Sequence, residues 1–311
     1  MIWTYLFFLV SLVLVIFGAR YFLSASISLS QLLRFPEIVV GATFIALATT
    51  MPEILVSVFS SASKHTSLAL GNILGSGLVN LGLIFGFVLL VGGVKREAGN
   101  TSKVRSLFLF FLVLFIYFWL WFVGNINFVT GLLLIGLGFA FLGYNFRSAL
   151  KESGDDLLYI ETELKTHVKV LFQFLLGAFL LIVGSRFLVE SGISLAQTLG
   201  LPEVIIGLTL IAVGTSVPEI MTALMSLLSG HSRVSVGNLI GATVLVFTFS
   251  LGLVGVVSGI TIDRLTLQAE FILLLFFGLV GLVFAFFPRM PQRLLGFILL
   301  ASYLVYFIFL I

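Results

Sequence analysis

The sequence predicts an all-α membrane protein: ten transmembrane helices as two inverted five-helix repeats, with broken helices at their centre. Three observations lead to this prediction. Apolar residues make up 60% of the 311 residues and charged residues only 9%, which is far outside the composition of soluble domains. The apolar residues fall into runs of bilayer length, and one half of the chain resembles the other.

Ten segments satisfy the requirement of about 20 apolar residues for one crossing. They are residues 2–23, 38–63, 68–93, 106–124, 126–146, 168–189, 204–229, 233–258, 266–287 and 292–311. The first run lacks a basic n-region and a small-residue cleavage site. We therefore expect it to be a permanent span and not a signal peptide.

Basic residues predict which side of the membrane each loop faces, because cytoplasmic loops carry an excess of Lys and Arg. With the N-terminus outside, only Lys64, Arg186 and Arg264 of the 16 basic residues fall outside. We expect a multi-pass protein of the cell (plasma) membrane with its N-terminus outside. The net charge of +3 then reflects topology, and no nucleic-acid-binding surface is expected.

The only long hydrophilic stretch is residues 147–167, RSALKESGDDLLYIETELKTH. It divides the chain into a first repeat, residues 1–146, and a second repeat, residues 168–311. Its mixed charges are typical of a solvated linker, which the topology places in the cytoplasm. A regulatory ion-binding loop is the alternative, but the acidic residues lack the spacing of an EF-hand loop.

The two repeats align without a gap at an offset of 166 residues, so that Gly18 meets Gly184 and Glu53 meets Glu219. Five expected spans separate equivalent points. An odd number of crossings reverses the direction of the second copy, which gives an inverted repeat. Inverted halves have two related packings that open to opposite sides, an arrangement typical of secondary transporters.

A proline and a glutamate interrupt matching apolar runs, in TMPE at residues 50–53 and in SVPE at residues 216–219. Thr50 and Ser216 suit a helix N-cap, the prolines suit the first turn, and the glutamates complete a capping box. We therefore expect both spans to be broken near their middle. The prolines leave carbonyls without their helical partners; these belong to Ala46, Leu47, Ala48, Thr49, Ala212, Val213, Gly214 and Thr215.

Glu53 and Glu219 are the only two of the 13 acidic residues that fall at mid-span. A capping role alone is the alternative, but glutamine would cap a helix without a charge that costs about 3 kcal/mol at the bilayer centre. Two carboxylates beside free carbonyls and hydroxyls form a cage of hard oxygen ligands suited to calcium or sodium. Calcium would relieve the repulsion between the carboxylates fully, and sodium ions or protons would relieve it in part.

The spans that follow these motifs open with GNILGSGLVNLG at residues 71–82 and GNLIGATVLVFT at residues 237–248. Glycines spaced four apart favour close helix packing, which is one interpretation of both segments. The first copy also offers Ser76 and Asn80 on one helical face. The second copy has Ala242 and Val246 at these places, so the two halves do not contribute equally.

The TTMPE and GTSVPE segments, each followed by GN..G, resemble the two alpha-repeats of the cation/calcium antiporters. The ten-span layout is most similar to the prokaryotic sodium/calcium exchangers, and the resemblance covers nearly the whole chain. It implies a secondary antiporter that moves calcium across the membrane in exchange for sodium by alternating access.

The resemblance also implies a set of ion ligands. Calcium would be bound by the carboxylates of Glu53 and Glu219 and the carbonyls of Thr49 and Thr215. Asn80 would line the central position. Sodium would share the two glutamates and would use the hydroxyls of Thr50, Ser216 and Ser76 and the carbonyls of Ala46 and Ala212.

Three positions depart from the pattern of those exchangers. Ala242 stands where a serine usually helps to hold sodium, Val246 stands where an acidic or amide residue is usual, and Ala48 replaces a usual glycine. The calcium-type centre is intact, whereas one sodium position lacks a hydroxyl. Coupling of calcium to protons or to another counter-ion therefore stays open beside sodium.

Two other classes are less consistent with the sequence. A cation channel formed by a ring of identical subunits does not need an inverted repeat within one chain. An enzyme is not expected, because the chain has no cysteine and its histidines, His65, His167 and His231, lie at span ends. No cofactor is expected beside the transported calcium and sodium. Because one chain carries both halves, a monomer in the lipid bilayer is sufficient.

Overall fold

Long apolar helices make up almost all of the described chain, as the sequence predicts. The computed structural model describes residues 2–32, 45–92, 94, 100–153, 164–228, 232–261 and 267–310. The helices of the first half are α1 (Ile2–Leu32), α3 (Ala46–Ala62), α4 (Thr66–Leu78), η2 (Val79–Ile84), α5 (Phe85–Val91), α6 (Asn100–Val123) and α7 (Phe128–Ser153). Those of the second half are α8 (Leu164–Leu199), α9 (Glu203–Ile206), η3 (Gly207–Ile211), α10 (Ala212–Thr215), α11 (Val217–Leu228), α12 (Ser232–Leu245), η4 (Val246–Ser250), α13 (Leu251–Val257), α14 (Gln268–Phe286) and α15 (Gln292–Leu310).

Within the described residues, eight helical stretches are long and apolar enough to cross a membrane. They coincide with eight of the ten expected spans. The stretch of residues 203–228 is a ninth candidate, formed by two helices that meet at a bend. The expected span at residues 38–63 contains the shorter apolar helix α3, and its residues 38–44 lie outside the described residues.

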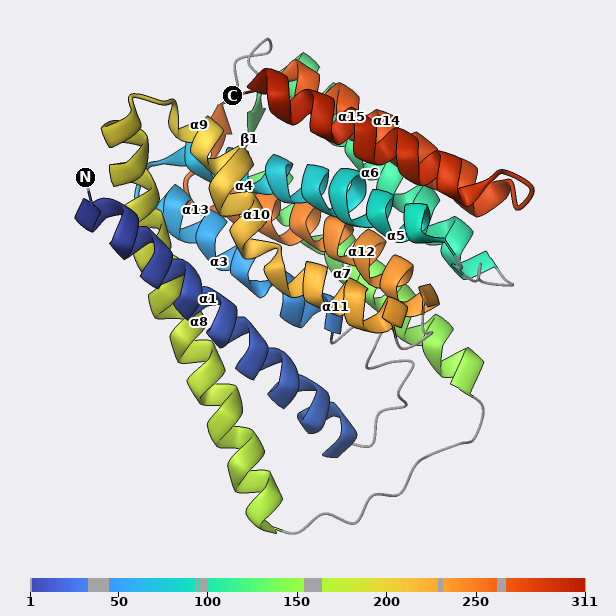
Figure 1. Cartoon of the computed structure of the whole chain (residues 1–311), viewed down its shortest axis with the longest axis horizontal. Helices are drawn as coiled ribbons and strands as arrows, with labels where there is room; N and C mark the ends of the chain where they lie inside the picture. Colours follow the sequence, from blue (N-terminus) through green and yellow to red (C-terminus); the bar gives the residue numbers. More distant parts are fainter. Residues whose placement is uncertain are drawn as a thin grey trace.

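Two helices extend well beyond the spans expected for them. α1 continues to Leu32, past the expected end at residue 23, and α8 covers Leu164–Leu199. The expected linker is shortened accordingly, because α7 continues to Ser153; residues 154–163 lie outside the described residues. α1 and α8 lie along one another at the edge of the molecule (Figure 1). Glycine allows this approach, since a Cβ at Gly177 would lie 2.4 Å from the backbone nitrogen of Phe22.

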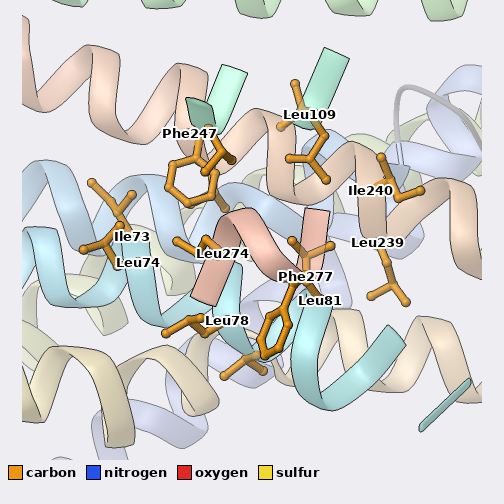
Figure 2. Close-up of a cluster of buried hydrophobic side chains, with 14 of the residues drawn as sticks. Ile73, Leu74, Leu78, Leu81, Leu109, Leu239, Ile240, Phe247, Leu274 and Phe277 are labelled. Carbon is orange, nitrogen blue, oxygen red and sulfur yellow. The ribbon is translucent and has the colours of Figure 1, made fainter. Parts of the chain in front are cut away.

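The centre of the molecule is formed by α4–η2–α5 and its counterpart α12–η4–α13. These two stretches are 83% buried, far more than any other candidate span. Leucine, isoleucine and phenylalanine side chains from them meet those of α6 and α14 in one apolar cluster (Figure 2). The cluster includes Ile73, Leu74, Leu78, Leu81, Leu109, Leu239, Ile240, Phe247, Leu274 and Phe277.

In the second half, the helical stretch bends at the place where a break was predicted. α10 ends at Thr215, α11 begins at Val217, and the two stretches of the span meet at a bend of 42°. Ser216 lies at the bend, and its carbonyl accepts a hydrogen bond from the backbone N–H of Ile220 at 3.0 Å. That bond is typical of a residue at the N-cap position.

The corresponding break at Thr50 was predicted wrongly. α3 continues from Ala46 to Ala62 with Pro52 inside it. Thr50 does not cap a helix; its hydroxyl donates to the carbonyl of Ala46, one turn earlier, at 2.6 Å. Pro52 lacks the N–H that would bond to the carbonyl of Ala48, and the loss of this one hydrogen bond does not end the helix.

A short sheet connects the two halves at one end of the molecule. β1 (Asn125–Ile126) follows α6 and pairs antiparallel with β2 (Ile260–Thr261), which follows α13. The two chain ends lie at this same end, whereas the end of α7 and the start of α8 lie at the opposite one (Figure 1). The termini and the junction of the two halves thus lie at opposite ends of the helices.

Candidate ion-binding site

Glu53 lies in α3 with no exposed surface. The hydroxyl of Ser216, at the bend of the second half, donates a hydrogen bond to its Oε1 at 3.1 Å. The acid of one repeat therefore meets the hydroxyl of the other, although 163 residues separate them. Both residues are among the predicted ligands.

Glu219 is equally buried, in the first turn of α11. Neither of its carboxylate oxygens meets hydrogen-bond geometry with any described residue. The Thr49 hydroxyl faces it, and the Glu53 carboxyl is near enough for its charge to act on Glu219. The structure thus brings two carboxyls together inside the membrane-spanning part of the molecule and leaves the second without a donor among the described residues.

The predicted threonines donate their hydroxyls to predicted carbonyls of their own half. Thr49 and Thr50 both donate their hydroxyls to the carbonyl of Ala46, at 3.2 and 2.6 Å. In the second half, Thr215 donates its hydroxyl to the carbonyl of Ala212 at 3.3 Å. All five residues are buried, so these oxygens are held in place without competing water.

Ser76 and Asn80 are fully buried, and neither side chain has a hydrogen-bond partner among the described residues. Ser76 follows Gly75, where an added Cβ would lie 2.6 Å from the Cβ of Ala212. α4 therefore approaches the second half beside a predicted ligand. Asn80 lies in η2, near the middle of the buried stretch. In the other half, Ala242 and Val246 are fully buried as well, so no polar group stands at either place.

Asn72 was missed by the sequence-based prediction. Its Nδ2 donates to the carbonyl of Glu53 at 3.2 Å and to the hydroxyl of Ser57 at 2.9 Å. Its Oδ1 accepts the hydroxyl of Thr215 at 3.2 Å. Asn72 therefore connects the acid of the first repeat to a predicted ligand of the second. The signal was present in the repeated GN dipeptide, whose asparagine recurs at Asn238.

Three π-helical segments next to the site also went unpredicted, and η3 ends at Ile211, directly before Ala212. η2 begins at Val79, and η4 begins at Val246, the counterpart of Asn80. π-helical turns are rare and recur at functional sites, where they change the direction of side chains within a helix. A pattern of apolar residues gives no indication of them.

One histidine has a different environment from the solvated span end that was expected. His65 precedes α4, and its Nδ1 lies 2.8 Å from Oε1 of Glu203 at the start of α9, with both side chains partly buried. His167 and His231 lie outside the residues whose side chains are described. The described residues contain no cluster of three or more His, Cys, Asp or Glu side chains that could hold a metal ion.

The arrangement is chemically suited to a hard cation. It offers two carboxylates, hydroxyls and backbone carbonyls, and neither sulfur nor imidazole is among the predicted ligands. Calcium and sodium prefer such oxygen ligands, whereas softer transition metals prefer nitrogen and sulfur. A buried carboxyl such as Glu219 is costly when charged and unpaired, which favours a cation beside it.

Comparison with known proteins agrees with this chemistry. Residues 3–147 and 169–311 match the family described as sodium/calcium exchanger protein. The inner membrane protein YrbG of Escherichia coli is 31% identical over 96% of this chain and 94% of its own length. The sodium/calcium exchanger MaX1 of Methanosarcina acetivorans is 25% identical over 98% of this chain and 97% of its own.

A solved structure has the same fold. The sodium-calcium exchanger NCX_Mj, soaked with Na⁺ and Sr²⁺, superposes with a TM-score of 0.70 over 98% of this chain and 97% of its own, at 23% identity. The family consists of membrane transporters and not of enzymes, as the sequence predicts. The buried acids, the repeated motifs and a match over almost the whole length lead to one conclusion: the chain belongs to the sodium/calcium exchanger protein family.

Proposed function

We propose that this protein moves calcium across the membrane in exchange for sodium by alternating access, using ten spans in two inverted five-helix repeats. The observation that carries the proposal is a hydrogen bond between the two repeats: the hydroxyl of Ser216 in the second half donates to the buried carboxyl of Glu53 in the first. A site between two inverted repeats becomes accessible from either side when the repeats exchange packings.

The proposed calcium ligands are the carboxylates of Glu53 and Glu219 with the carbonyls of Thr49 and Thr215. Their burial supports the assignment, because an ion bound there is stripped of water on most sides and needs oxygen ligands in its place. Asn80 lines the central position. The proposed sodium ligands are the same glutamates, the hydroxyls of Thr50, Ser216 and Ser76, and the carbonyls of Ala46 and Ala212.

A proton-coupled exchange of calcium is the second candidate. It is favoured by one observation: Ala242 and Val246 are fully buried at the places where the first half has Ser76 and Asn80. Two oxygen-bearing side chains are therefore missing on the second side of the proposed site. Glu53 and Glu219 would then carry protons in place of sodium.

The test is calcium uptake by the purified protein in proteoliposomes. We expect an outward sodium gradient to drive uptake of calcium into the vesicles. Uptake driven by a pH gradient without sodium, together with no response to a sodium gradient, would establish the proton-coupled alternative. Passive entry of calcium without any counter-ion gradient would refute both exchangers and identify a channel.

The proposal places the protein in the cell membrane, with its N-terminus outside and the junction of residues 147–167 in the cytoplasm. Both chain ends lie at the end of the molecule opposite this junction, which supports an even number of crossings (Figure 1). All proposed ligands come from one chain, so a monomer is sufficient, and no cofactor is needed beside the two transported ions.

A further inference from the structure

The two repeats are alike in sequence around the site but differ in their hydrogen bonds. Asn72 and Asn238 are counterparts in the GN dipeptides, and both are buried. Asn72 makes three hydrogen bonds, to Glu53, Ser57 and Thr215. Neither amide atom of Asn238 has a partner in the part of the chain that the structure describes.

The same difference extends to the neighbouring groups. Glu53 accepts a hydrogen bond from Ser216, whereas the Glu219 carboxyl faces the hydroxyl of Thr49 without meeting hydrogen-bond geometry with any residue that the structure describes. Ser216 turns its hydroxyl across to the other repeat, whereas its counterpart Thr50 turns its hydroxyl back onto the carbonyl of Ala46. The two hydrogen bonds that link the repeats in this group, from Thr215 to Asn72 and from Ser216 to Glu53, are both donated by the second half to the first.

Adding 166 to the number of each partner of Asn72 gives the partners that Asn238 would have in a mirrored arrangement. Its amide nitrogen would donate to the carbonyl of Glu219, and its oxygen would accept the hydroxyl of Thr49. α12 packs against α3, as α4 packs against α10, so the helices that carry these groups are neighbours. Ser57 has Ala223 as its counterpart, so the mirrored set has two hydrogen bonds and not three.

We propose that Asn72 and Asn238 are positioning residues that form alternating links between the repeats, one closed in each of the two access states. This proposal rests on the proposed alternating access and adds residues that do not bind the ion. The link through Asn72 is closed in the structure described here. When the repeats exchange packings, it opens and the link through Asn238 closes. The third bond, to Ser57, biases the protein toward the state with the Asn72 link closed.

The physical reason is the cost of leaving an amide buried without partners. Moving between the states adds hydrogen bonds to one asparagine and removes them from the other, so the two costs largely cancel. A symmetric pair of links keeps both states close in free energy, which a transporter needs in order to cycle. A single link would hold the protein in one state.

Accessibility of a single thiol tests the proposal. The chain has no cysteine, so Ala242→Cys introduces one thiol at the counterpart position of Ser76 without replacing a proposed ligand. Its rate of reaction with a membrane-impermeant thiol reagent is measured in right-side-out and in inside-out vesicles, with equal calcium on both sides. The ratio of the two rates reports the balance between the access states, and it does not depend on the counter-ion.

The proposal fixes the sign of four shifts in this ratio. Asn72→Leu and Ser57→Ala weaken the link that is closed here, and Ala223→Ser adds the missing hydroxyl to the other link, so all three move the ratio in one direction. Asn238→Leu moves it in the opposite direction. We expect changes of roughly fivefold for each hydrogen bond lost or gained. Ser57→Ala and Ala223→Ser are the mild variants that remain informative if Asn72→Leu fails to fold.

Shifts in the same direction for Asn72→Leu and Asn238→Leu, or no shift in any of the four variants, would overturn the proposal. General loosening of the packing cannot produce opposite signs, so it is distinguished from a positioning role. Failure of the proposed exchange is a separate result, because it would appear as absent calcium transport in the unmodified protein, whatever the labelling ratios.

Discussion

Glu53 and Glu219 are the residues on which calcium binding is proposed to depend. Each lies without exposed surface in a helix of the membrane-spanning part. A charge at the bilayer centre costs about 3 kcal/mol on insertion scales, and two nearby carboxylates repel one another. A bound calcium ion removes both penalties, which explains how the acids can be retained at this depth.

Replacing either acid by its amide tests this role. Glu53→Gln or Glu219→Gln should reduce calcium uptake in proteoliposomes to the level of empty vesicles, because the amide lacks the charge that binds a divalent ion. The fold should be kept, since glutamine can still accept the hydroxyl of Ser216. Glu270→Gln is the matched control: Glu270 is a buried acid that accepts a hydrogen bond from Tyr306 outside the proposed site. Wild-type uptake by either site variant would refute the assignment.

Ala242 and Val246 lead to a prediction about sodium. The double variant Ala242→Ser with Val246→Asp adds oxygens opposite Ser76 and Asn80, so the half-saturating sodium concentration should fall, by about tenfold if the two new ligands contribute about 1.4 kcal/mol. The measurement is sodium-driven calcium uptake at a series of sodium concentrations. Calcium binding to the same variant without sodium is the control for general damage. An unchanged or higher half-saturating concentration would contradict the prediction.

At the scale of elements, close crossing of helices is what brings the repeats together. α4 contacts α9 and η3 of the other half along a glycine seam. A Cβ at Gly71 would lie 2.4 Å from the carbonyl oxygen of Val204, and one at Gly207 would lie 2.6 Å from that of Leu68. Only glycine allows the backbones to approach this closely.

An added methyl group should therefore force these helices apart. Gly71→Ala and Gly207→Ala should each destabilise the folded protein by about 1–3 kcal/mol, the usual cost of overpacking. Gly136→Ala is the control, because no atom lies within 4 Å of a Cβ there and alanine favours the helix. Thermal unfolding in detergent should show lower midpoints for the first two variants and an unchanged or higher midpoint for the third. Equal midpoints in all three would show that the seam is not tightly packed in the membrane protein.

At the scale of the whole molecule, the basic residues predict how the protein is oriented in the membrane. Thirteen of the 16 basic residues fall on one side if the N-terminus is outside, which predicts a cytoplasmic junction between the repeats. In the structure, the end of α7 and the start of α8 lie at the opposite end of the helices from the chain ends (Figure 1). The fold itself does not indicate which end faces the cytoplasm, so the prediction of orientation rests on the charges.

Single cysteines in this cysteine-free chain test the orientation. Ser153→Cys, in the junction, should react with an impermeant thiol reagent only in inside-out vesicles. Ser63→Cys, in the exposed turn between α3 and α4, should react only in right-side-out vesicles. The reverse pattern would place the N-terminus inside.

The sequence by itself was enough to identify a membrane protein, the positions of eight candidate spans, the family and two buried acids. These features depend on local composition or on simple repetition. An apolar run of bilayer length predicts a span whatever the rest of the fold is, and the offset of 166 residues is visible in the sequence alone. Glu53 and Glu219 stood out because charges are rare in such runs.

Only the tertiary structure decided how the hydroxyls and amides are used. Thr50 and Ser216 occupy equivalent positions, yet Thr50 bonds to its own helix and α3 stays unbroken, whereas Ser216 bonds to Glu53 and its helix bends by 42°. Asn72 likewise meets Thr215, 143 residues away. A short polar side chain has several partners within reach, and which one it takes depends on the residues that folding brings beside it. Two halves that are alike in sequence can for this reason form different hydrogen bonds.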